Sequence, residues 1–534
     1  MIDPNPPLRS VRSPNHQVAS ADQLATTAGV STFAKGGNAV DAAIATNAAI
    51  AVTGPHLCGL GGDLFALVVL DDGDEAEVFG LNASGRAGSG ADSAAMRAQG
   101  LDSMPFRHDI RSVTVPGCVD GWIALHERFG SLPLSDCLAP AIDLARNGFP
   151  ASPLLARSVQ MLEPRSAESL SELAQQATQR GRRVRRPGVA DALEAIAVSG
   201  REGFYAGTFG AGLVELGDGL YSEADLAQNQ ADWVDPLSAD AFGVRLHTIG
   251  PNSQGYLALG SSVLAERLDL PSDPDDERWA HLLIEASIAA GRDRTEALHE
   301  AADGDALVAA IAARRAEIGT ERATVRSVPI ADGDTTYLCT AGVGSDGRRM
   351  AVSLIQSNAA GFGSHLVEPN TGVNLHNRGM GFSLESGHSA ELGPGRRPPH
   401  TLLPMAATGL DGRLAGVFGT MGGDAQPQIM LQVAARLFHH RQTPARALGA
   451  GRWALKGPET GFDTWTAPQG PIVAIEGQAP DGWAAALAER GHRTATTPPW
   501  DSGFGHACAI LAGRDGMWVG SGDPRTVIGT CAGG

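Results

Sequence analysis

The sequence has few aromatic residues, few cysteines and no long apolar run. Aromatic side chains make up 5% of the 534 residues, and the six cysteines are scattered without a C-x-x-C pair, which argues against both a zinc knot and a disulfide framework. No uninterrupted apolar stretch reaches the roughly 20 residues of a membrane span. The first sixteen residues lack an apolar core, so we expect no secretory signal and a cytoplasmic protein with reduced thiols.

Basic residues are outnumbered as well. The chain carries 41 Lys and Arg against 59 Asp and Glu, a net charge of −18, and such a surface repels nucleic acid and anionic lipid. We therefore expect neither nucleic acid nor a membrane as a partner. The His439-His440 pair has no third ligand beside it in the sequence, and no glycine turn fits a phosphate-binding frame. We expect no metal and no cofactor.

The periodicity predicts an α+β protein. Residues 17–55 form two alanine-rich helical patterns, and two apolar strand patterns follow them; residues 119–320 are mostly helical by period. After a polar, linker-like stretch at 319–334, residues 335–357 predict a β-hairpin. Strand-rich and helix-rich blocks on both sides of the linker indicate a layered α/β/β/α arrangement. The remaining expected elements are strands at 412–420, 472–475 and 506–520 and helices at 426–439 and 480–490.

Thr335 stands in an unusual place, at the end of the linker and at the start of a strand pattern, in the segment DGDTTY. If the peptide bond between Asp334 and Thr335 is broken, Thr335 carries both a hydroxyl nucleophile and a free α-amine. That amine has an unperturbed pKa of about 8, near enough to neutrality to act as the general base for its own hydroxyl. An ordinary pair of strand threonines is the alternative interpretation of the same residues.

Many ordered motifs resemble the γ-glutamyltranspeptidase family. They run from about Val18 to Arg525 and include GGNAVDAA, GLGGD, GFYAG, GPNSQG, DTTY, QSN, LHNRGMGFSL, PGRRPPHTLLP, GTMGGD and GSGDPR. The resemblance implies a four-layer αββα N-terminal-nucleophile hydrolase sandwich and a zymogen that cleaves itself. Its large subunit would be residues 1–334 and its small subunit residues 335–534, together forming one domain.

The family pattern also implies the catalytic residues. Thr335 matches the threonine that becomes the new N-terminus after autoproteolysis between Asp334 and Thr335. Asn358 matches the asparagine that orients the nucleophile or contacts substrate. Gly422 and Gly423 match the glycine pair whose N–H groups form the oxyanion hole, where losing one donor costs roughly 100- to 1000-fold in rate.

The substrate-binding positions depart from the family pattern. Ser84 stands where true γ-glutamyl enzymes hold the α-carboxylate with an arginine, Arg86 lies two residues on, and Gly381 replaces the aspartate that binds the α-amine. Because a buried ammonium needs a paired anion, the site should disfavour a glutamyl amine. Arg86 and Arg378 could instead bind a carboxylate through bidentate contacts. The expected substrate-binding residues are Arg86, Thr336, Gln356, Arg378, His400 and Thr401.

The resulting hypothesis is a hydrolase that cleaves an amide bond of a small carboxylate-bearing substrate through an acyl-enzyme on Thr335. The L-x-N-R-G-x-x-F-S-L pattern resembles the branch of the family that includes oxamate amidohydrolase and cephalosporin-acylase-like enzymes. Transfer of the acyl group to an acceptor amine is left open, as is the pairing of αβ units into a dimer. The alternatives are a true γ-glutamyltransferase or glutathione hydrolase and a catalytically silent ligand-binding relative.

Overall fold

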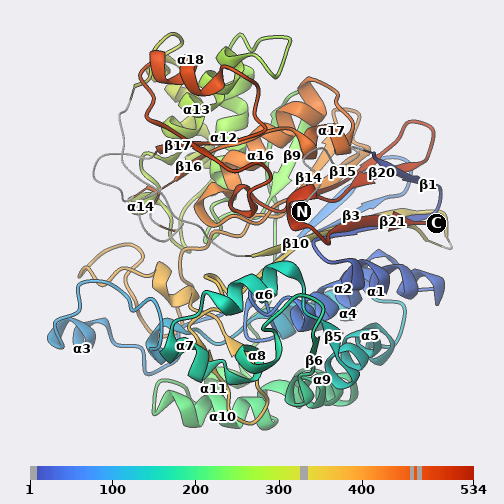
Figure 1. Cartoon of the computed structure of the whole chain (residues 1–534), viewed down its shortest axis with the longest axis vertical. Helices are drawn as coiled ribbons and strands as arrows, with labels where there is room; N and C mark the ends of the chain where they lie inside the picture. The colour runs from blue at the N-terminus through green and yellow to red at the C-terminus, as the bar shows by residue number, and fades with distance from the viewer. Residues whose placement is uncertain (1–8, 325–334, 345, 457–461, 463, 466–471) are drawn as a thin grey trace.

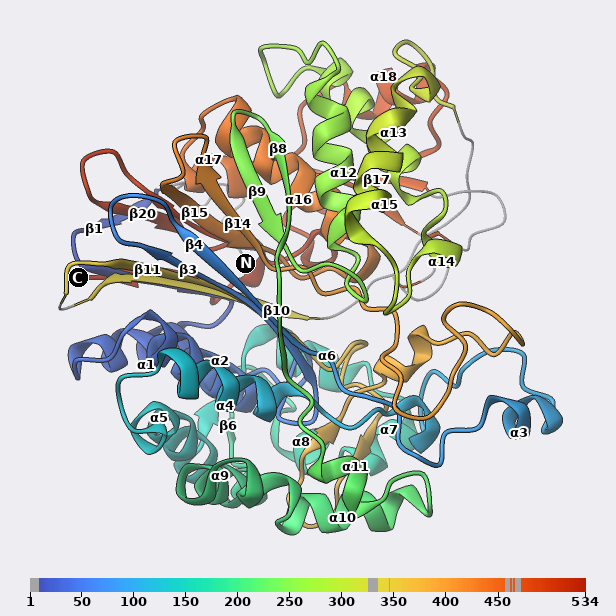
Figure 2. The same ribbon diagram turned by 180° about the vertical axis from the view of Figure 1, so that it is seen from behind.

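Two seven-stranded sheets lie face to face in the described part of the chain (Figure 1 and Figure 2). The computed structural model describes residues 9–324, 335–344, 346–456, 462, 464–465 and 472–534. The first sheet has the order β21-β2-β10-β11-β3-β4-β7 and the second β1-β20-β19-β15-β14-β9-β8. The strands of the first sheet, in that order, are Thr530–Gly533, His16–Ser20, Thr336–Val343, Arg349–Ser357, Asp63–Asp71, Glu77–Ala83 and Asp232–Val234. Those of the second are Val11–Ser13, Trp518–Ser521, Cys508–Ala512, Leu414–Gly419, Met405–Gly409, Val244–Thr248 and Leu237–Ala241.

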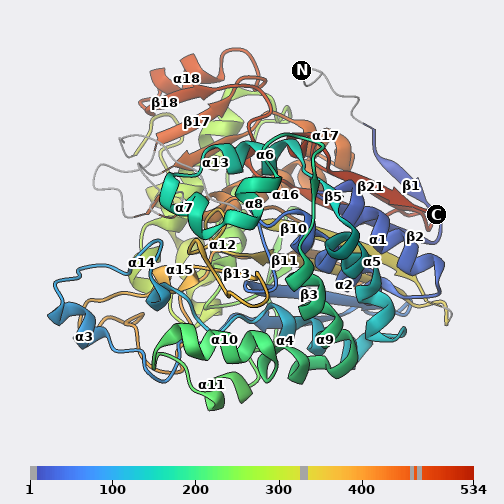
Figure 3. The same cartoon turned by 60° about the horizontal axis from the view of Figure 1, so that its bottom comes forward.

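Helices cover the outer face of each sheet. Figure 3 brings forward the layer on the first sheet. Its main helices are α1 (Gln23–Ala34), α2 (Ala39–Thr53), α4 (Cys118–Phe129), α5 (Leu134–Asn147), α6 (Pro153–Gln160), α7 (Pro164–Ser169), α8 (Ser171–Gln176), α9 (Pro187–Tyr205), α10 (Thr208–Gly217) and α11 (Glu223–Ala227). The layer on the second sheet includes α12 (Gly255–Glu266), α13 (Glu277–Gly291), α15 (Gly304–Ala312), α16 (Gln426–Ala434), α17 (Pro444–Gly449) and α18 (Trp483–Glu489).

Smaller elements complete the described fold. A three-stranded sheet contains β16 (Trp453–Lys456), β17 (Ile472–Glu476) and β18 (Thr494–Thr497), beside α18. The short pieces are α3 (Ser93–Ala98), α14 (Arg294–Ala297), β5 (Phe149–Pro150), β6 (Arg183–Val184), β12 (Leu366–Val367) and β13 (Asn374–Leu375). None of the described helices combines the length and the apolar character that crossing a membrane requires.

The alternation of side chains along β3 explains the layering. Phe65 and Leu67 pack in the core between the sheets, whereas Ala66 and Val68 pack in the core under the helices. A strand buried on both faces has a near-continuous apolar sequence, which accounts for the run LFALVVL that follows Asp63. The predicted four-layer αββα sandwich is therefore confirmed.

Most of the predicted elements are present, with two differences. The helix pair of residues 17–55 and the hairpin of residues 335–357 are confirmed as α1, α2, β10 and β11. The helical interpretation of residues 119–320 missed the β8–β9 hairpin, whose short strands lie within a chain segment of mainly helical period. The expected strand at 506–520 consists of two strands, β19 and β20. The part of the predicted linker at 325–334 lies outside the described residues.

Candidate active site

Thr335 lies directly before β10 and is fully buried. In the β10–β11 ladder Thr336 faces Gln356, so Thr335 comes beside Ser357 at the end of β11. The Thr335 Oγ1 atom is 3.0 Å from the Ser357 Oγ atom. Ser357, the middle residue of the QSN motif, was not among the predicted site residues, yet it is the hydroxyl in direct contact with the predicted nucleophile.

Asn358 follows β11 and packs against the glycine turn at 59–62. Its backbone N–H donates to the Leu57 carbonyl over 3.3 Å, and a Cβ atom added at Gly62 would lie 2.8 Å from its Oδ1 atom. Both polar atoms of the Asn358 side chain are buried and have no hydrogen-bond partner among the described residues. Buried amides are normally satisfied, so this side chain is available to a ligand.

Gln356 has a different position from the one expected of a substrate ligand. Its Nε2 atom donates a hydrogen bond of 2.6 Å to the carbonyl of Gly59, so it holds the glycine turn that receives Asn358. The Gln356 Oε1 atom and the Thr336 Oγ1 atom are buried without a hydrogen-bond partner in the described part of the chain.

The glycine pair Gly422-Gly423 connects β15 of the second sheet to α16. Their φ angles of +138° and +54° lie in the region that favours glycine. The pair stands at the start of a helix, where backbone N–H groups and the helix dipole favour negative charge. Gly419, three residues before the pair, packs directly against the ring of Tyr337. A Cβ atom added at Gly419 would lie 2.3 Å from that ring. This contact places the end of β15, three residues before the glycine pair, against the residue two positions after Thr335.

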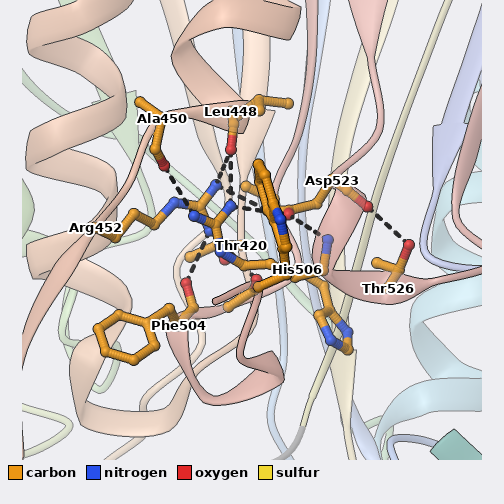
Figure 4. Close-up of polar contacts among 12 residues, drawn as sticks. Thr420, Leu448, Ala450, Arg452, Phe504, His506, Asp523 and Thr526 are labelled. Atoms are coloured by element: carbon orange, nitrogen blue, oxygen red, sulfur yellow. Dashed lines mark hydrogen bonds and ion pairs between the residues drawn. The ribbon is translucent and has the colours of Figure 1, made fainter. Parts of the chain in front are cut away.

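A buried ion network lies close to Thr420, two residues before the glycine pair (Figure 4). Asp523 accepts from Arg452 over 2.8 Å and from Arg525 over 3.0 Å, and Arg525 also pairs with Glu476. Burial disfavours a charged Asp523, but the two guanidinium groups outweigh it and lower its pKa. Arg452 donates to the carbonyl of Phe504 over 2.8 Å, which fixes the loop that precedes β19.

The loop at residues 504–505 contacts the two residues that precede Gly422 and Gly423. A Cβ atom added at Gly505 would lie 2.3 Å from the Thr420 Oγ1 atom and 2.8 Å from the Met421 carbonyl oxygen. The GSGDPR motif, which contains Asp523 and Arg525, therefore stabilises the position of the predicted oxyanion glycines through the 504–505 backbone.

A second buried network holds the predicted substrate ligand His400. Its Nε2 atom donates to the Asp63 carboxylate over 3.1 Å, and its Nδ1 atom accepts from the Leu402 N–H. Burial lowers the pKa of His400 to about 3, so the ring is neutral. Burial opposes the charge on Asp63, but the adjacent His376 and the hydrogen bond from His400 dominate and lower its pKa to about 2. The structure thus places His400 in contact with Asp63, the first residue of β3.

Arg378 is the predicted ligand with the least satisfied environment. The residue is 2% exposed, and its Nε and Nη2 atoms make no hydrogen bond among the described residues. Its guanidinium lies over the Phe462 ring at 5.5 Å. Burial lowers its pKa to about 10, partly offset by Asp63, so it stays protonated at neutral pH. The preceding residue, Asn377, donates its N–H to the Asn358 carbonyl over 3.2 Å, so Arg378 lies one residue from a direct contact with Asn358.

Arg86 has a partner of its own. Its Nη2 atom is 2.8 Å from the Asp232 carboxylate, in a partly exposed ion pair. Asp232 also pairs with Arg397 over 2.8 Å. The structure therefore joins Arg86 to the β7 edge of the first sheet.

A polar bridge that the sequence analysis did not find connects Thr401 to the glycine pair. Gln254 donates to the carbonyls of Thr401 over 2.9 Å and of Gly423 over 3.0 Å. Its Oε1 atom accepts from Arg294, whose guanidinium pairs with Asp424 over 3.1 Å. The Thr401 Oγ1 atom is buried and unpaired within the described residues. The GPNSQG motif contained the signal for this bridge, but its long sequence distance from residues 401 and 423 concealed the contact.

The chain is similar to proteins of one family over nearly its whole length. The family model described as gamma-glutamyltranspeptidase matches residues 25–532. The chain is 33% identical to a glutathione hydrolase-like YwrD proenzyme from Bacillus subtilis, covering 97% of this chain and 98% of that protein. It is also 33% identical to an oxamate amidohydrolase proenzyme from Klebsiella pneumoniae, covering 96% of each.

The structural comparison finds the same architecture. A crystal structure of cephalosporin acylase from Bacillus halodurans superimposes with a TM-score of 0.87 at 34% identity, over 99% of this chain and 98% of that one.

Proposed function

Since this chain belongs to the γ-glutamyltranspeptidase family, we propose that it is a self-processing amidohydrolase whose nucleophile is Thr335. Cleavage between Asp334 and Thr335 gives a large subunit, 1–334, and a small subunit, 335–534. Asp334 lies outside the described residues, whereas Thr335 is buried beside Ser357. Strands from both sides of the proposed cut share each sheet, and β10 lies between β2 and β11, so the subunits remain one folded unit.

The freed α-amine of Thr335 accepts the proton of its own hydroxyl as the oxygen attacks the substrate carbonyl. Ser357 and Asn358 orient the nucleophile. The N–H groups of Gly422 and Gly423 stabilise the oxyanion of the tetrahedral intermediate. Collapse of that intermediate protonates and releases the amine, and water then hydrolyses the ester to regenerate Thr335.

The observation that carries the substrate proposal is the buried guanidinium of Arg378, whose Nε and Nη2 atoms have no hydrogen-bond partner among the described residues. A buried cation with open N–H donors requires an anionic partner, and a carboxylate matches its planar fork. We therefore propose that the substrate is a small amide that also bears a carboxylate. A true γ-glutamyl substrate fits less well, because Gly381 supplies no carboxylate for an α-amine.

The decisive test compares the wild type with Thr335→Ala. We expect two wild-type fragments that meet at Asp334/Thr335, an uncut variant, and a loss of amidase activity on the order of 10⁴-fold or more. Intact-mass measurement checks the cleavage, and an assay of oxamate-like amides beside glutathione checks the substrate. A wild type that remains a single chain would remove the α-amine from the mechanism and support a silent ligand-binding relative.

The cytoplasmic location and the pairing of αβ units into a dimer stay predictions. Cell fractionation tests the first, and light scattering of the processed protein tests the second.

A further inference from the structure

Three potential metal ligands meet far from Thr335 in the sequence and in the fold. His281 and Glu285 lie one turn apart on α13, and His492 follows α18. Their ligand atoms lie within 4.8 Å of one another, and all three residues are buried. The two helices are in contact in the outer layer of the second sheet (Figure 1). Among the described residues this is the group of His, Cys, Asp and Glu side chains that brings three such atoms together.

The hydrogen bonds determine where the lone pairs point. The His281 Nε2 atom is 2.7 Å from the Gly319 carbonyl oxygen, and a carbonyl only accepts, so Nε2 carries the proton. With the proton on Nε2, the Nδ1 atom of a neutral His281 ring is bare. That atom lies 2.8 Å from the His492 Nε2 atom. The two rings therefore share a single proton between facing nitrogens.

The surroundings match those of a metal site. Ligating histidines usually donate their other N–H to a carbonyl or carboxylate, and ligating carboxylates are themselves hydrogen-bonded. His281 donates to Gly319, and Glu285 accepts from both the backbone N–H and the hydroxyl of Thr324, over 3.2 and 2.7 Å.

The nearby positive charge is balanced. Arg490 lies close to the two histidines. Glu277 and Glu321 lie 3.8 and 3.7 Å from its guanidinium, so a divalent cation in the cluster would not face an unpaired arginine.

We propose that His281, Glu285 and His492 bind one Zn²⁺ ion, with water as the fourth ligand. Two imidazoles and a carboxylate favour zinc over magnesium or calcium. The facing nitrogens need to separate by about 0.5 Å to span a tetrahedral ion with Zn–N bonds of about 2.0–2.1 Å. When the ion binds, the proton between the rings moves to the His492 Nδ1 atom, so both rings stay neutral and turn a lone pair to the metal.

The ion would join two parts of the chain. Given the proposed cleavage, α13 belongs to the large subunit and His492 to the small one. The same ligands hold Gly319 and Thr324, near the last described residues before position 334. The bound Zn²⁺ is thus a structural connection between the subunits, separate from catalysis.

The experiment titrates ZnCl₂ into chelator-treated, processed enzyme by calorimetry, with metal analysis after gel filtration. We expect one tight Zn²⁺ per αβ unit, a Tm that rises with Zn²⁺, and tetrahedral visible bands when Co²⁺ replaces it. His492→Gln should lower the affinity by about 10- to 100-fold or more, while its amide can still donate to His281. Glu285→Gln removes the carboxylate independently.

His439→Gln, which alters an exposed histidine outside the cluster, is the matched control and should bind Zn²⁺ like the wild type. Thr335→Ala should also bind Zn²⁺, which separates this proposal from the catalytic one. A wild type that binds no Zn²⁺, or a His492→Gln variant of unchanged metal-free Tm that binds it equally well, would overturn the site.

Discussion

Two of the regions that bury arginine side chains differ in the partners they give to the charge. Near the turn that carries Gly422 and Gly423, the buried Arg452 and Arg525 pair with the carboxylates of Asp523 and Glu476. At the predicted substrate site, Arg378 is equally buried, yet two of its nitrogen atoms have no hydrogen-bond partner among the described residues. A satisfied buried charge maintains a structure, whereas an unsatisfied one is costly for the free protein. Arg452 also has one unpaired nitrogen atom, Nε, within the described residues, so the contrast lies in the carboxylate partners. We therefore expect Arg452 and Arg525 to act in folding and Arg378 to act in binding.

The largest stability effect should come from breaking the paired region. Asp523→Asn leaves Arg452 and Arg525 short of a negative partner, and losing one member of a buried pair costs about 3–5 kcal/mol. Urea unfolding should show this fall in the free energy of unfolding, measured in the Thr335→Ala background so that the chain stays uncut. A change below about 1 kcal/mol would refute the assignment of this network to folding.

Arg378→Gln should reduce activity without reducing stability. We expect kcat/KM for a carboxylate-bearing amide to fall about 10- to 100-fold, because a charge-assisted hydrogen bond contributes about 1.5–3 kcal/mol. The Tm should stay the same or rise, since the free enzyme loses a costly buried charge. Steady-state kinetics on the acid and on its neutral amide analogue checks this result, and the variant should discriminate between them less. An equal loss on both substrates would contradict a role in carboxylate recognition.

The hydrogen-bonded pair of Asp63 and His400 should make the free energy of unfolding depend on pH. The pKa of His400 is about 3 in the folded chain and about 6.5 in the unfolded chain. Between these values the unfolded chain binds the extra proton, so the free energy of unfolding falls as the pH falls, by up to about 1.4 kcal/mol per pH unit.

His400→Gln should lower the slope of the unfolding free energy against pH, by up to about 1.4 kcal/mol per pH unit, between pH 6.5 and 4.5. Urea unfolding at several pH values measures this slope. This range lies above the titration of Asp63, whose pKa is about 2. An unchanged slope would mean that His400 does not remain neutral in the folded protein.

The smallest effect is expected at Arg86, the other arginine that the sequence analysis assigned to substrate. Its ion pair with Asp232 is partly exposed, and such pairs contribute about 0–1 kcal/mol. Arg86→Gln should therefore change kcat/KM less than about twofold and lower the Tm only slightly. A loss as large as that of Arg378→Gln would restore Arg86 as a substrate ligand.

The sequence predicted the parts of the fold whose pattern is local. The alanine-rich helix pair, the buried strand DLFALVVL and the hairpin after Thr335 each have a period or a turn signal of their own. The β8–β9 hairpin was missed, because its strands are five residues each and lie in a mostly helical segment. The composition of such short strands differs too little from that of their surroundings to mark them.

The candidate site divides in the same way. Thr335, Asn358 and the glycine pair could be predicted from ordered motifs. Ser357 was overlooked although it belongs to one of those motifs, because nothing in the sequence shows that its hydroxyl meets Thr335 across the β10–β11 ladder. Gln254 and Asp63 contact residues more than 140 positions away, and such contacts leave no trace in local spacing.

The sequence by itself determined the family, the layered architecture and the residue types at the predicted nucleophile and oxyanion positions, because motifs and periodicity are properties of neighbouring residues. The tertiary structure decided which side chains are paired. It paired Arg86 with Asp232 and His400 with Asp63, and it brought His281 and Glu285 to His492. Within the described part of the chain it left two nitrogen atoms of Arg378 without a hydrogen-bond partner. Burial and long-range contact decide whether a charge is satisfied, and both arise only when distant segments of the chain pack together.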